Sequence, residues 1–311
     1  MNKEEFNKLY ETLKKSKFRQ QKFPGWRPLP TISCITIIFI SAGVFFIIFG
    51  IFILIFTGQI KEFKFRYDLF CAEKRRHSEK CEMSLSIPET MKKPIFIYYQ
   101  INDLRQNHRF YMDNKSNKQL KGEEVSKDDL EKNNECENYL YNEDMGNNIV
   151  DANHPANDIA FPCGLIAKSF FRDELISLEM SGKTITLTTE ELAYKSDIDS
   201  FSKVEYKTSH WLDISKEPFM IWSRIAPYKN PRKLWAKIEE DDIPSGTSIT
   251  VTIENNNYYT NEKYIILSTR NVFGGKSSFL GICYVVFGAF CLISAVIFIN
   301  VFNYFHKKEN I

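Results

Sequence analysis

The chain has 311 residues, of which 43% are hydrophobic and 26% are charged, and its formal net charge is +2 at pH 7. This length allows one or two domains. Residues 1–30 hold eight Lys or Arg and three Asp or Glu, whereas residues 57–278 hold 31 basic and 35 acidic side chains. Because the basic residues adjoin a hydrophobic run, they indicate membrane orientation rather than a nucleic-acid-binding surface.

The first 30 residues combine a helical pattern with a proline-rich stretch. Apolar side chains recur at i, i+3, i+4 and i+7, which predicts a short amphipathic helix. These side chains are Phe6, Leu9, Tyr10 and Leu13. The helix is either solvated and frayed, or it contacts a membrane surface or a cytosolic partner. Three prolines between residues 24 and 30 exclude a continuous helix there, so we expect that stretch to be extended.

Two long runs, residues 31–56 and 279–302, contain no Asp, Glu, Lys, Arg or His. At ~1.5 Å per residue, a helix over the first run would extend ~39 Å, which exceeds the ~30 Å hydrocarbon core of a bilayer. The alternatives are a cleaved signal peptide for the first run and a buried core helix for the second. A signal peptide has an apolar region of only about 7–15 residues, so we predict two transmembrane helices.

The charge pattern predicts the side of the membrane on which each segment lies. The basic N-terminal tail and the Lys307-Lys308 pair favour the cytosol for both termini. The predicted segments are a cytosolic tail (1–30), a transmembrane helix (31–56), a luminal or extracellular β-rich ectodomain (57–278), a second transmembrane helix (279–302) and a cytosolic tail (303–311). Neither helix carries a charge that would suit a proton relay or voltage sensor.

Small residues are regularly spaced in the predicted helices. Gly281, Gly288 and Ala295 lie seven residues apart in the second helix, and Gly43 and Gly50 repeat that spacing in the first. Small side chains allow membrane helices to approach closely, which predicts a packing face toward the other helix or a partner. Ordinary membrane composition is the alternative, since glycine is common in such helices.

The ectodomain contains short runs of β-branched and aromatic residues. These runs cover residues 95–99, 184–189, 248–253 and 264–268, and they predict antiparallel sheets. The segment 114–148 is rich in Lys, Glu, Asp and Asn, which predicts a solvated loop or insertion. The predicted fold class is therefore an α+β membrane protein with a mainly antiparallel, β-sandwich-like ectodomain.

Cysteine positions separate the ectodomain from the helices. Four cysteines lie in the ectodomain, and an even number in an oxidising compartment predicts two disulfides, with three pairings open. They are Cys71, Cys81, Cys136 and Cys163. No CxxC-like spacing is present, so no metal site is expected. The sequon Asn114-Lys115-Ser116 predicts N-glycosylation at Asn114.

The sequence offers no catalytic constellation. Gly274-Gly275-Lys276-Ser277 resembles part of a phosphate-binding loop, but Arg270 stands where that loop requires glycine. The histidines are scattered, without paired metal or catalytic spacing, and we expect His108 to be a hydrogen-bonding structural residue. No cofactor is expected, and the chain is not expected to be an enzyme.

The segment after the first predicted strand carries a distinctive motif. Its residues are Tyr98-Tyr99, Gln106-Asn107-His108-Arg109, Tyr111 and Gln119-Leu120. They resemble the signature of the ligand-effect modulator 3 / cell cycle control protein 50 family, the non-catalytic β subunits of lipid flippases. Further blocks resemble that family in the same order: residues 18–28, 161–173, 219–224, 232–235 and 266–281. Residues 193–197 depart from the family pattern because they lack its aromatic pair.

The resemblance implies an accessory subunit of a type IV P-type ATPase, a heterodimeric partner that moves phospholipid between leaflets. It implies a role in partner folding, exit from the endoplasmic reticulum and flippase activity, in a membrane of the secretory pathway (endoplasmic reticulum, Golgi, endosome or plasma membrane). It also supports the pairing Cys71–Cys81 and Cys136–Cys163. The residues of the family blocks that we expect to bind the partner or act as scaffold are Phe18, Gln21, Pro24, Trp26, Gln106, Asn107, His108, Arg109, Tyr111, Pro162, Gly164 and Phe171. The small-residue spacing adds Gly281 and Gly288.

Two other function classes share some of these features. A subunit of a two-span ligand-gated channel would have the same topology and a disulfide-containing ectodomain, but it would need self-association and polar pore-lining positions. An enzyme of the secretory lumen would need a set of reactive side chains, and no such set is suggested by the ectodomain sequence.

Overall fold

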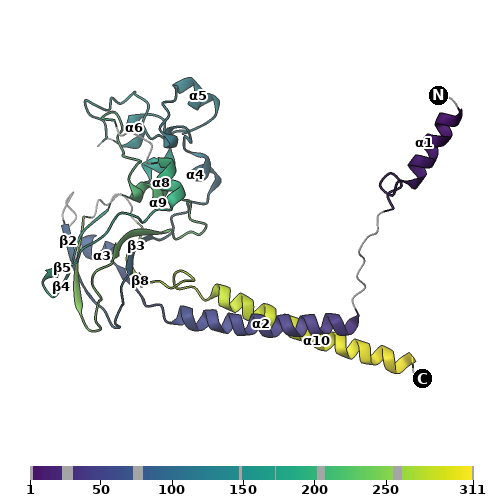
Figure 1. Cartoon of the computed structure of the whole chain (residues 1–311). Helices are drawn as coiled ribbons and strands as arrows, with labels where there is room; N and C mark the ends of the chain where they lie inside the picture. The colour runs from purple at the N-terminus through teal and green to yellow at the C-terminus, as the bar shows by residue number, and fades with distance from the viewer. Residues whose placement is uncertain are drawn as a thin grey trace. The chain divides into compact units, whose positions relative to one another are not determined.

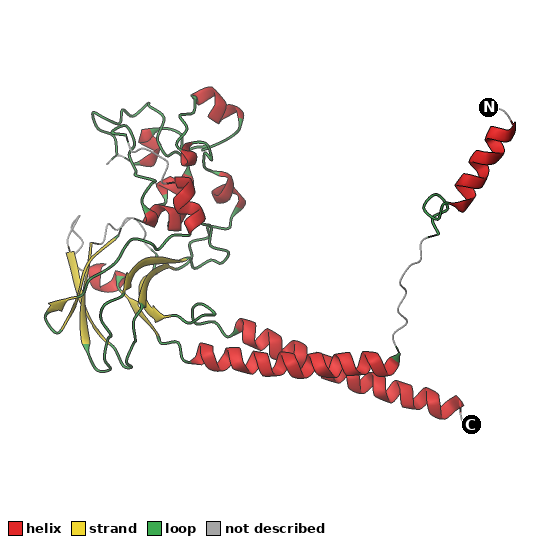
Figure 2. Ribbon diagram, in the orientation of Figure 1, coloured by secondary structure: helices red, strands yellow, loops and turns green. Residues whose placement is uncertain are grey.

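The computed structural model of the chain describes residues 3–22, 31–72, 80–146, 149–171, 173–201, 207–254 and 261–309. The chain divides into two compact units, one made of residues 1–53 and 279–311 and the other of residues 54–278. Figure 1 labels the elements, and Figure 2 shows that the first unit is helical while the second combines strands with short helices.

Three helices form the first unit among the described residues: α1 (Lys3–Lys15), α2 (Ile32–Gly58) and α10 (Phe279–Glu309). Residues 54–58, at the C-terminal end of α2, belong to the second unit. Helix α1 confirms the predicted amphipathic helix. Both α2 and α10 are long and apolar enough to cross a membrane. Each extends past the predicted run at its C-terminal end, to Gly58 and Glu309.

Helices α2 and α10 pack through their glycines. A Cβ atom added to Gly288 would lie 2.8 Å from the carbonyl oxygen of Gly43, and one added to Gly50 would lie 2.9 Å from that of Gly281. Any side chain larger than hydrogen would therefore push the two backbones apart. Ala295 continues this contact face and is almost fully buried.

The second unit contains two four-stranded antiparallel sheets, as the sequence predicts. The first has the strand order β1-β8-β3-β6, made of Glu62–Arg66, Lys263–Thr269, Ile95–Ile101 and Arg232–Ile238. The second has the order β2-β7-β4-β5, made of Lys80–Ser86, Ser248–Glu254, Glu174–Met180 and Lys183–Thr184.

The main core of this unit draws on both sheets. Ile97 and Leu267 from the first sheet and Val251 from the second are 0% exposed and belong to one hydrophobic cluster. Strand β2 alternates strictly between buried and exposed positions, as expected for a strand with one face in the core. Strand β3 is buried or half-buried along its whole length, which matches a sequence that is apolar except for Gln100.

One strand prediction is wrong. Residues 184–189 alternate like a strand, yet only Lys183–Thr184 pairs with β4, and Thr188 makes an isolated bridge to Lys237. The alternating β-branched residues favour an extended backbone. A strand also requires a neighbour with matching hydrogen bonds along its length, and the bonds to β4 reach only to Ile185, whose nitrogen donates to the Leu178 carbonyl at 2.8 Å.

Short helices form a separate lobe next to the sheets, between β3 and β6 in the chain (Figure 2). They are α4 (Arg109–Asp113), η1 (Gln119–Lys121), α5 (Lys127–Lys132), α6 (Asn142–Met145), α7 (Leu165–Lys168), α8 (Lys195–Phe201) and α9 (Glu217–Ser223). A further helix, α3 (Asp68–Ala72), follows β1. The lobe has small cores of its own that include residues of 114–146, so this part of the polar segment is a folded insertion rather than a solvated loop.

Candidate partner-binding and scaffold region

The two disulfides have the pairing that the family resemblance implies. Cys71 and Cys81 join α3 to β2 with a Cα–Cα distance of 5.5 Å. Cys136 and Cys163 lie in the helical lobe, with a Cα–Cα distance of 5.7 Å and a sequence separation of 27. Both half-cystines of the second bond are buried in one of the small cores of the lobe.

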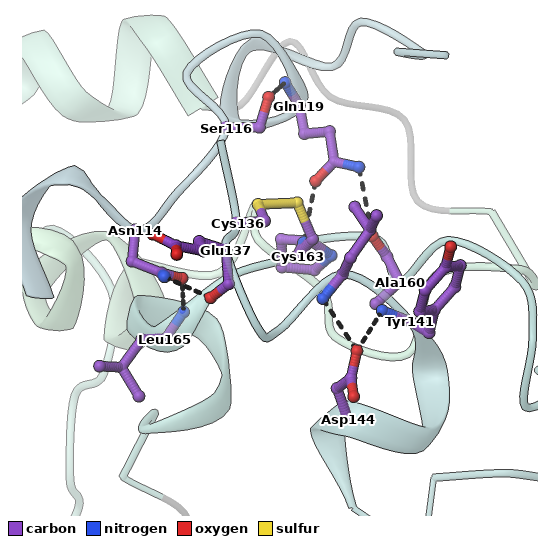
Figure 3. The surroundings of a disulfide bond; sticks show 12 residues. Asn114, Ser116, Gln119, Cys136, Glu137, Tyr141, Asp144, Ala160, Cys163 and Leu165 are labelled. Carbon is purple, nitrogen blue, oxygen red and sulfur yellow. Dashed lines mark hydrogen bonds between the residues drawn. A yellow bond between two sulfur atoms is a disulfide. The ribbon is translucent and has the colours of Figure 1, made fainter. Parts of the chain in front are cut away.

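The amide of Gln119 holds the chain on one side of the Cys136–Cys163 bond (Figure 3). Its oxygen accepts a hydrogen bond from the Cys163 backbone nitrogen at 2.8 Å, and its nitrogen donates to the Ala160 carbonyl at 3.2 Å. The side chain is 2% exposed, so both bonds form away from water, where leaving either group unpaired would be costly. Gln119 thus fixes the backbone that carries Cys163.

The side-chain amide of Asn114 also holds the backbone near the Cys136–Cys163 bond, at Glu137 and Leu165 (Figure 3). Its nitrogen donates to the Glu137 carbonyl at 2.6 Å, and its oxygen accepts from the Leu165 backbone nitrogen at 2.7 Å. Asn114 is 3% exposed. A glycan on this nitrogen would have to displace buried backbone partners, so the geometry opposes the predicted glycosylation.

Gly164 is required by the close approach of two chain segments. Its φ is +98°, a conformation that side-chain-bearing residues rarely adopt. A Cβ atom there would lie 2.5 Å from the carbonyl oxygen of Asn114. The neighbouring Pro162 uses its carbonyl oxygen to accept a hydrogen bond from Trp211 Nε1 at 2.8 Å. Both residues therefore serve as scaffold within the lobe.

The Gln106–Tyr111 block divides into inward and outward residues. Gln106 is fully buried and accepts a hydrogen bond from the Ala226 backbone nitrogen at 3.1 Å. Its amide nitrogen donates to the Tyr111 hydroxyl at 3.3 Å, and that hydroxyl lies 2.7 Å from Ser169 Oγ. Gln106 and Tyr111 thus link the loop after β3 to the segment after α7.

The residues between them face outward. Asn107 donates to the Pro227 carbonyl at 2.8 Å but is exposed. Arg109 has a side chain that is 92% exposed and pairs with Asp113 at 3.4 Å. His108 precedes α4, and its backbone carbonyl accepts from Met112, but its side chain makes no capping bond to the helix. The hydrogen bond predicted for the His108 side chain is not found among the described residues.

Phe171 belongs to an aromatic cluster beside β3. Its ring stacks on Tyr99 with centroids 3.9 Å apart and meets Trp235 edge-on at 6.0 Å. Such contacts add to the free energy gained by burying the rings. Phe171 is 5% exposed, so its ring packs inside the second unit.

The remaining predicted residues lie in the first unit. Phe18 is 75% exposed in the turn after α1, and Gln21 in the same turn has a φ of +52°. Pro24 and Trp26 lie outside the described residues. Gly281 and Gly288 lie on the packed face of α10.

The sequence analysis missed a buried ion pair. Lys263 Nζ lies 2.7 Å from Asp173 Oδ2, and the two side chains are 2% and 1% exposed. Asp173 also accepts from the Tyr67 hydroxyl at 2.9 Å. Burial, followed by the charge of Asp173, raises the pKa of Tyr67 well above its usual value. The signal in the sequence is a lysine that opens the otherwise uncharged strand β8.

A second buried lysine closes the end of a helix. Lys233 Nζ donates to the carbonyls of Ile221 and Trp222 at 3.2 Å each, and to that of Arg224. Burial, aided by the Arg224 charge, lowers the pKa of Lys233 to about 8. The last carbonyls of α9 would otherwise lack donors, so Lys233 stabilises the helix end against β6.

Comparison with known proteins supports the resemblance. A sequence model of the LEM3 (ligand-effect modulator 3) family / CDC50 family matches residues 53–309. The chain is 30% identical to "ALA-interacting subunit 3" of Arabidopsis thaliana over 92% of this chain and 84% of that protein. It is 27% identical to "Cell cycle control protein 50A" of Mus musculus over 94% of this chain and 90% of that one.

A third relative has a more explicit name. The chain is 27% identical to "Phospholipid-transporting ATPase accessory subunit CRF1" of Saccharomyces cerevisiae, over 71% of this chain and 59% of that protein. The family match covers α10, both sheets, the helical lobe and both disulfides. The chain therefore belongs to the LEM3 (ligand-effect modulator 3) family / CDC50 family.

Proposed function

We propose that this chain is the accessory β subunit of a phospholipid-translocating type IV P-type ATPase. The observation that carries the proposal is membership of a family in which one relative, matched over 71% of this chain, is named "Phospholipid-transporting ATPase accessory subunit CRF1", and another, matched over 92%, is named "ALA-interacting subunit 3". The subunit is non-catalytic: the partner hydrolyses ATP, and this chain supports the partner's folding, its exit from the endoplasmic reticulum and its flippase activity.

The proposed topology places both termini in the cytosol and the ectodomain in the lumen or outside the cell. The basic N-terminal tail supports this orientation, and two disulfides in residues 54–278 fit an oxidising compartment. The complex acts in a membrane of the secretory pathway, in the endoplasmic reticulum, Golgi, endosome or plasma membrane.

The exposure of the family residues supports different tasks for them. Gln106, Tyr111 and Phe171 are buried, which supports a scaffold role. Asn107, His108 and Arg109, at the start of α4, are exposed, and we take this outward strip as the candidate contact with the ATPase. Contact on the ectodomain and contact on the cytosolic tail at Phe18–Arg27 would together favour the partner conformations that satisfy both.

The first test is co-purification of the tagged chain from its own cells in mild detergent, with mass spectrometry of what accompanies it. A stoichiometric P-type ATPase is expected. A closed homo-oligomer without an ATPase, which conducts current on expression, would overturn the proposal in favour of a ligand-gated channel.

The second test addresses the outward strip. Arg109→Glu reverses a charge on a side chain that is 92% exposed, so it leaves folding intact while reducing recovery of the ATPase. Lys132→Glu makes the same charge change on the exposed surface of α5 and is the matched control. Equal recovery with both variants would exclude Arg109 from the contact.

A further inference from the structure

Residues 271–274 form a tight turn with an apolar tip. The backbone nitrogens of Asn271 and Gly274 donate to each other's carbonyls at 3.1 and 3.0 Å. The Phe273 nitrogen donates to Asn271 Oδ1 at 2.9 Å. Val272 at the tip is 97% exposed and Phe273 is 41% exposed. Tips of turns are normally occupied by Gly, Asn, Asp, Ser or Pro, so two adjacent apolar side chains here need an explanation.

This turn is attached to the end of helix α2. Asn271 Nδ2 donates to the Phe56 carbonyl at 3.0 Å, and the rings of Phe56 and Phe273 meet edge-on with centroids 6.3 Å apart. Phe56 lies in the final turn of α2, which ends at Gly58 and is long and apolar enough to cross a membrane. A bilayer that surrounds α2 near Phe56 therefore reaches the level of the turn.

We propose that Val272 and Phe273 insert into the headgroup–acyl boundary of the leaflet that faces the ectodomain. The turn satisfies its own backbone donors at Asn271, Phe273 and Gly274, which reduces the cost of entering a poorly hydrated layer. An aromatic ring at this depth is typical of membrane interfaces. The exposed Lys276 shortly after the turn is positioned in the chain to meet lipid phosphates.

The inserted turn would hold the C-terminal end of β8 at a defined depth in the membrane interface. Only Arg270 separates Thr269, the last residue of β8, from the turn. The inference requires that α2 and α10 span a bilayer but does not depend on the identity of the partner. The alternative is that a protein surface of the partner covers the turn. The hydrogen bond between the turn and α2 favours lipid, because the bilayer around α2 lies next to the turn before any partner binds.

The test uses the full chain in lipid nanodiscs, alone and with the co-purified ATPase. Val272→Cys is labelled with an environment-sensitive fluorophore in a background in which the free cysteines Cys34, Cys283 and Cys291 are replaced by alanine. Tyr228→Cys, at an ectodomain site that is 78% exposed, is the matched control. Quenching is measured with aqueous iodide and with phospholipids that carry a nitroxide on the acyl chain.

The proposal expects the Val272 label to be quenched by nitroxide lipids and protected from iodide severalfold relative to the Tyr228 label in the chain alone. The Val272 label is expected to keep the same nitroxide quenching and iodide protection in the complex. Equal iodide quenching at both sites in the chain alone would overturn the proposal. Protection from iodide without nitroxide quenching, seen only when the ATPase is present, would show that a protein covers the turn and would also overturn it.

Discussion

At the scale of single residues, the Lys263–Asp173 pair shows how much a buried charge depends on its partner. Asp173→Leu leaves the Lys263 ammonium in a site that is 2% exposed, so we expect the free energy of unfolding to fall by about 3–5 kcal/mol. Urea unfolding of the detergent-solubilised chain, followed by tryptophan fluorescence, measures this loss.

The matched control for Asp173→Leu removes both charges. Asp173→Leu combined with Lys263→Met is expected to recover a large part of the lost stability, because neither side chain then carries an unpaired charge. If the single variant is as stable as the original chain, the unpaired Lys263 charge does not lower the free energy of unfolding and the prediction is wrong.

Gly164 makes a second prediction at this scale. Gly164→Ala would destabilise the fold for two reasons. The φ of +98° is unfavourable for alanine, and the new Cβ atom would lie 2.5 Å from the Asn114 carbonyl oxygen. Gly246→Ala shares a positive φ, +77°, but meets no atom within 4 Å. We therefore expect Gly246→Ala to cost about 1 kcal/mol and Gly164→Ala clearly more, measured by urea unfolding. Equal losses in the free energy of unfolding would mean that the close approach of residue 164 to the Asn114 carbonyl does not affect stability.

The burial of Asn114 predicts that its sequon is unmodified in the folded protein. The peptide containing Asn114 should have its unmodified mass, and the full chain should not shift on treatment with an endoglycosidase. A glycan on Asn114 in protein that retains the Cys136–Cys163 bond and native stability would contradict the hydrogen bonds to Glu137 and Leu165.

At the scale of elements, the two disulfides are expected to differ in their contributions. The Cys136–Cys163 bond closes a segment with a sequence separation of 27, against 10 for Cys71–Cys81. Loop-closure entropy alone predicts stabilisation of about 3.6 and about 2.7 kcal/mol, respectively. Paired Cys→Ala variants compared by urea unfolding should rank in this order. The reverse order would indicate that the short helices hold together without the bond.

The packing of α2 against α10 is a second feature at the scale of elements. Gly288→Ala places a methyl group 2.8 Å from the Gly43 carbonyl, so the helices must separate. Gly58→Ala, at the end of α2, meets no atom within 4 Å and is the matched control. We expect a lower melting temperature only for Gly288→Ala in detergent. Identical melting temperatures would exclude tight packing at this glycine.

At the scale of the whole molecule, buried tyrosines predict a loss of stability at alkaline pH. Burial, followed by Tyr111 and Asp173, raises the pKa of Tyr99 well above its usual value. In the unfolded chain Tyr99 loses its proton near pH 10, while the folded chain still retains it. The free energy of unfolding should therefore fall as pH rises above about 10, by about 1.4 kcal/mol per pH unit for each such tyrosine.

The variant Tyr99→Phe isolates this contribution because it keeps the stacked ring and removes the titrating hydroxyl. Unfolding measured between pH 8 and 11 should show a shallower decline for the variant than for the original chain. An unchanged slope would mean that Tyr99 ionises equally easily in the folded and unfolded states.

Much of the architecture could be predicted because it depends on local chemistry. The two apolar helices follow from long uncharged runs, and strands β3, β7 and β8 follow from β-branched and aromatic runs. The strand prediction at residues 184–189 failed because a strand depends on non-local contacts. An alternating pattern does not show which neighbouring strand is available for pairing. The order of the strands in the two sheets likewise depends on contacts far apart in the chain.

The two candidate membrane helices, the even set of ectodomain cysteines and, through the ordered motifs, the family are all readable from the amino-acid sequence. Which motif residues face inward depends on the folded arrangement. Gln106 and Arg109 belong to one short motif, yet the first is fully buried and the second has a side chain that is 92% exposed. The folded arrangement also places Asn114 in the interior as a hydrogen-bonded amide. The physical reason is that burial depends on partners brought together by folding, and these partners lie tens to more than a hundred residues away.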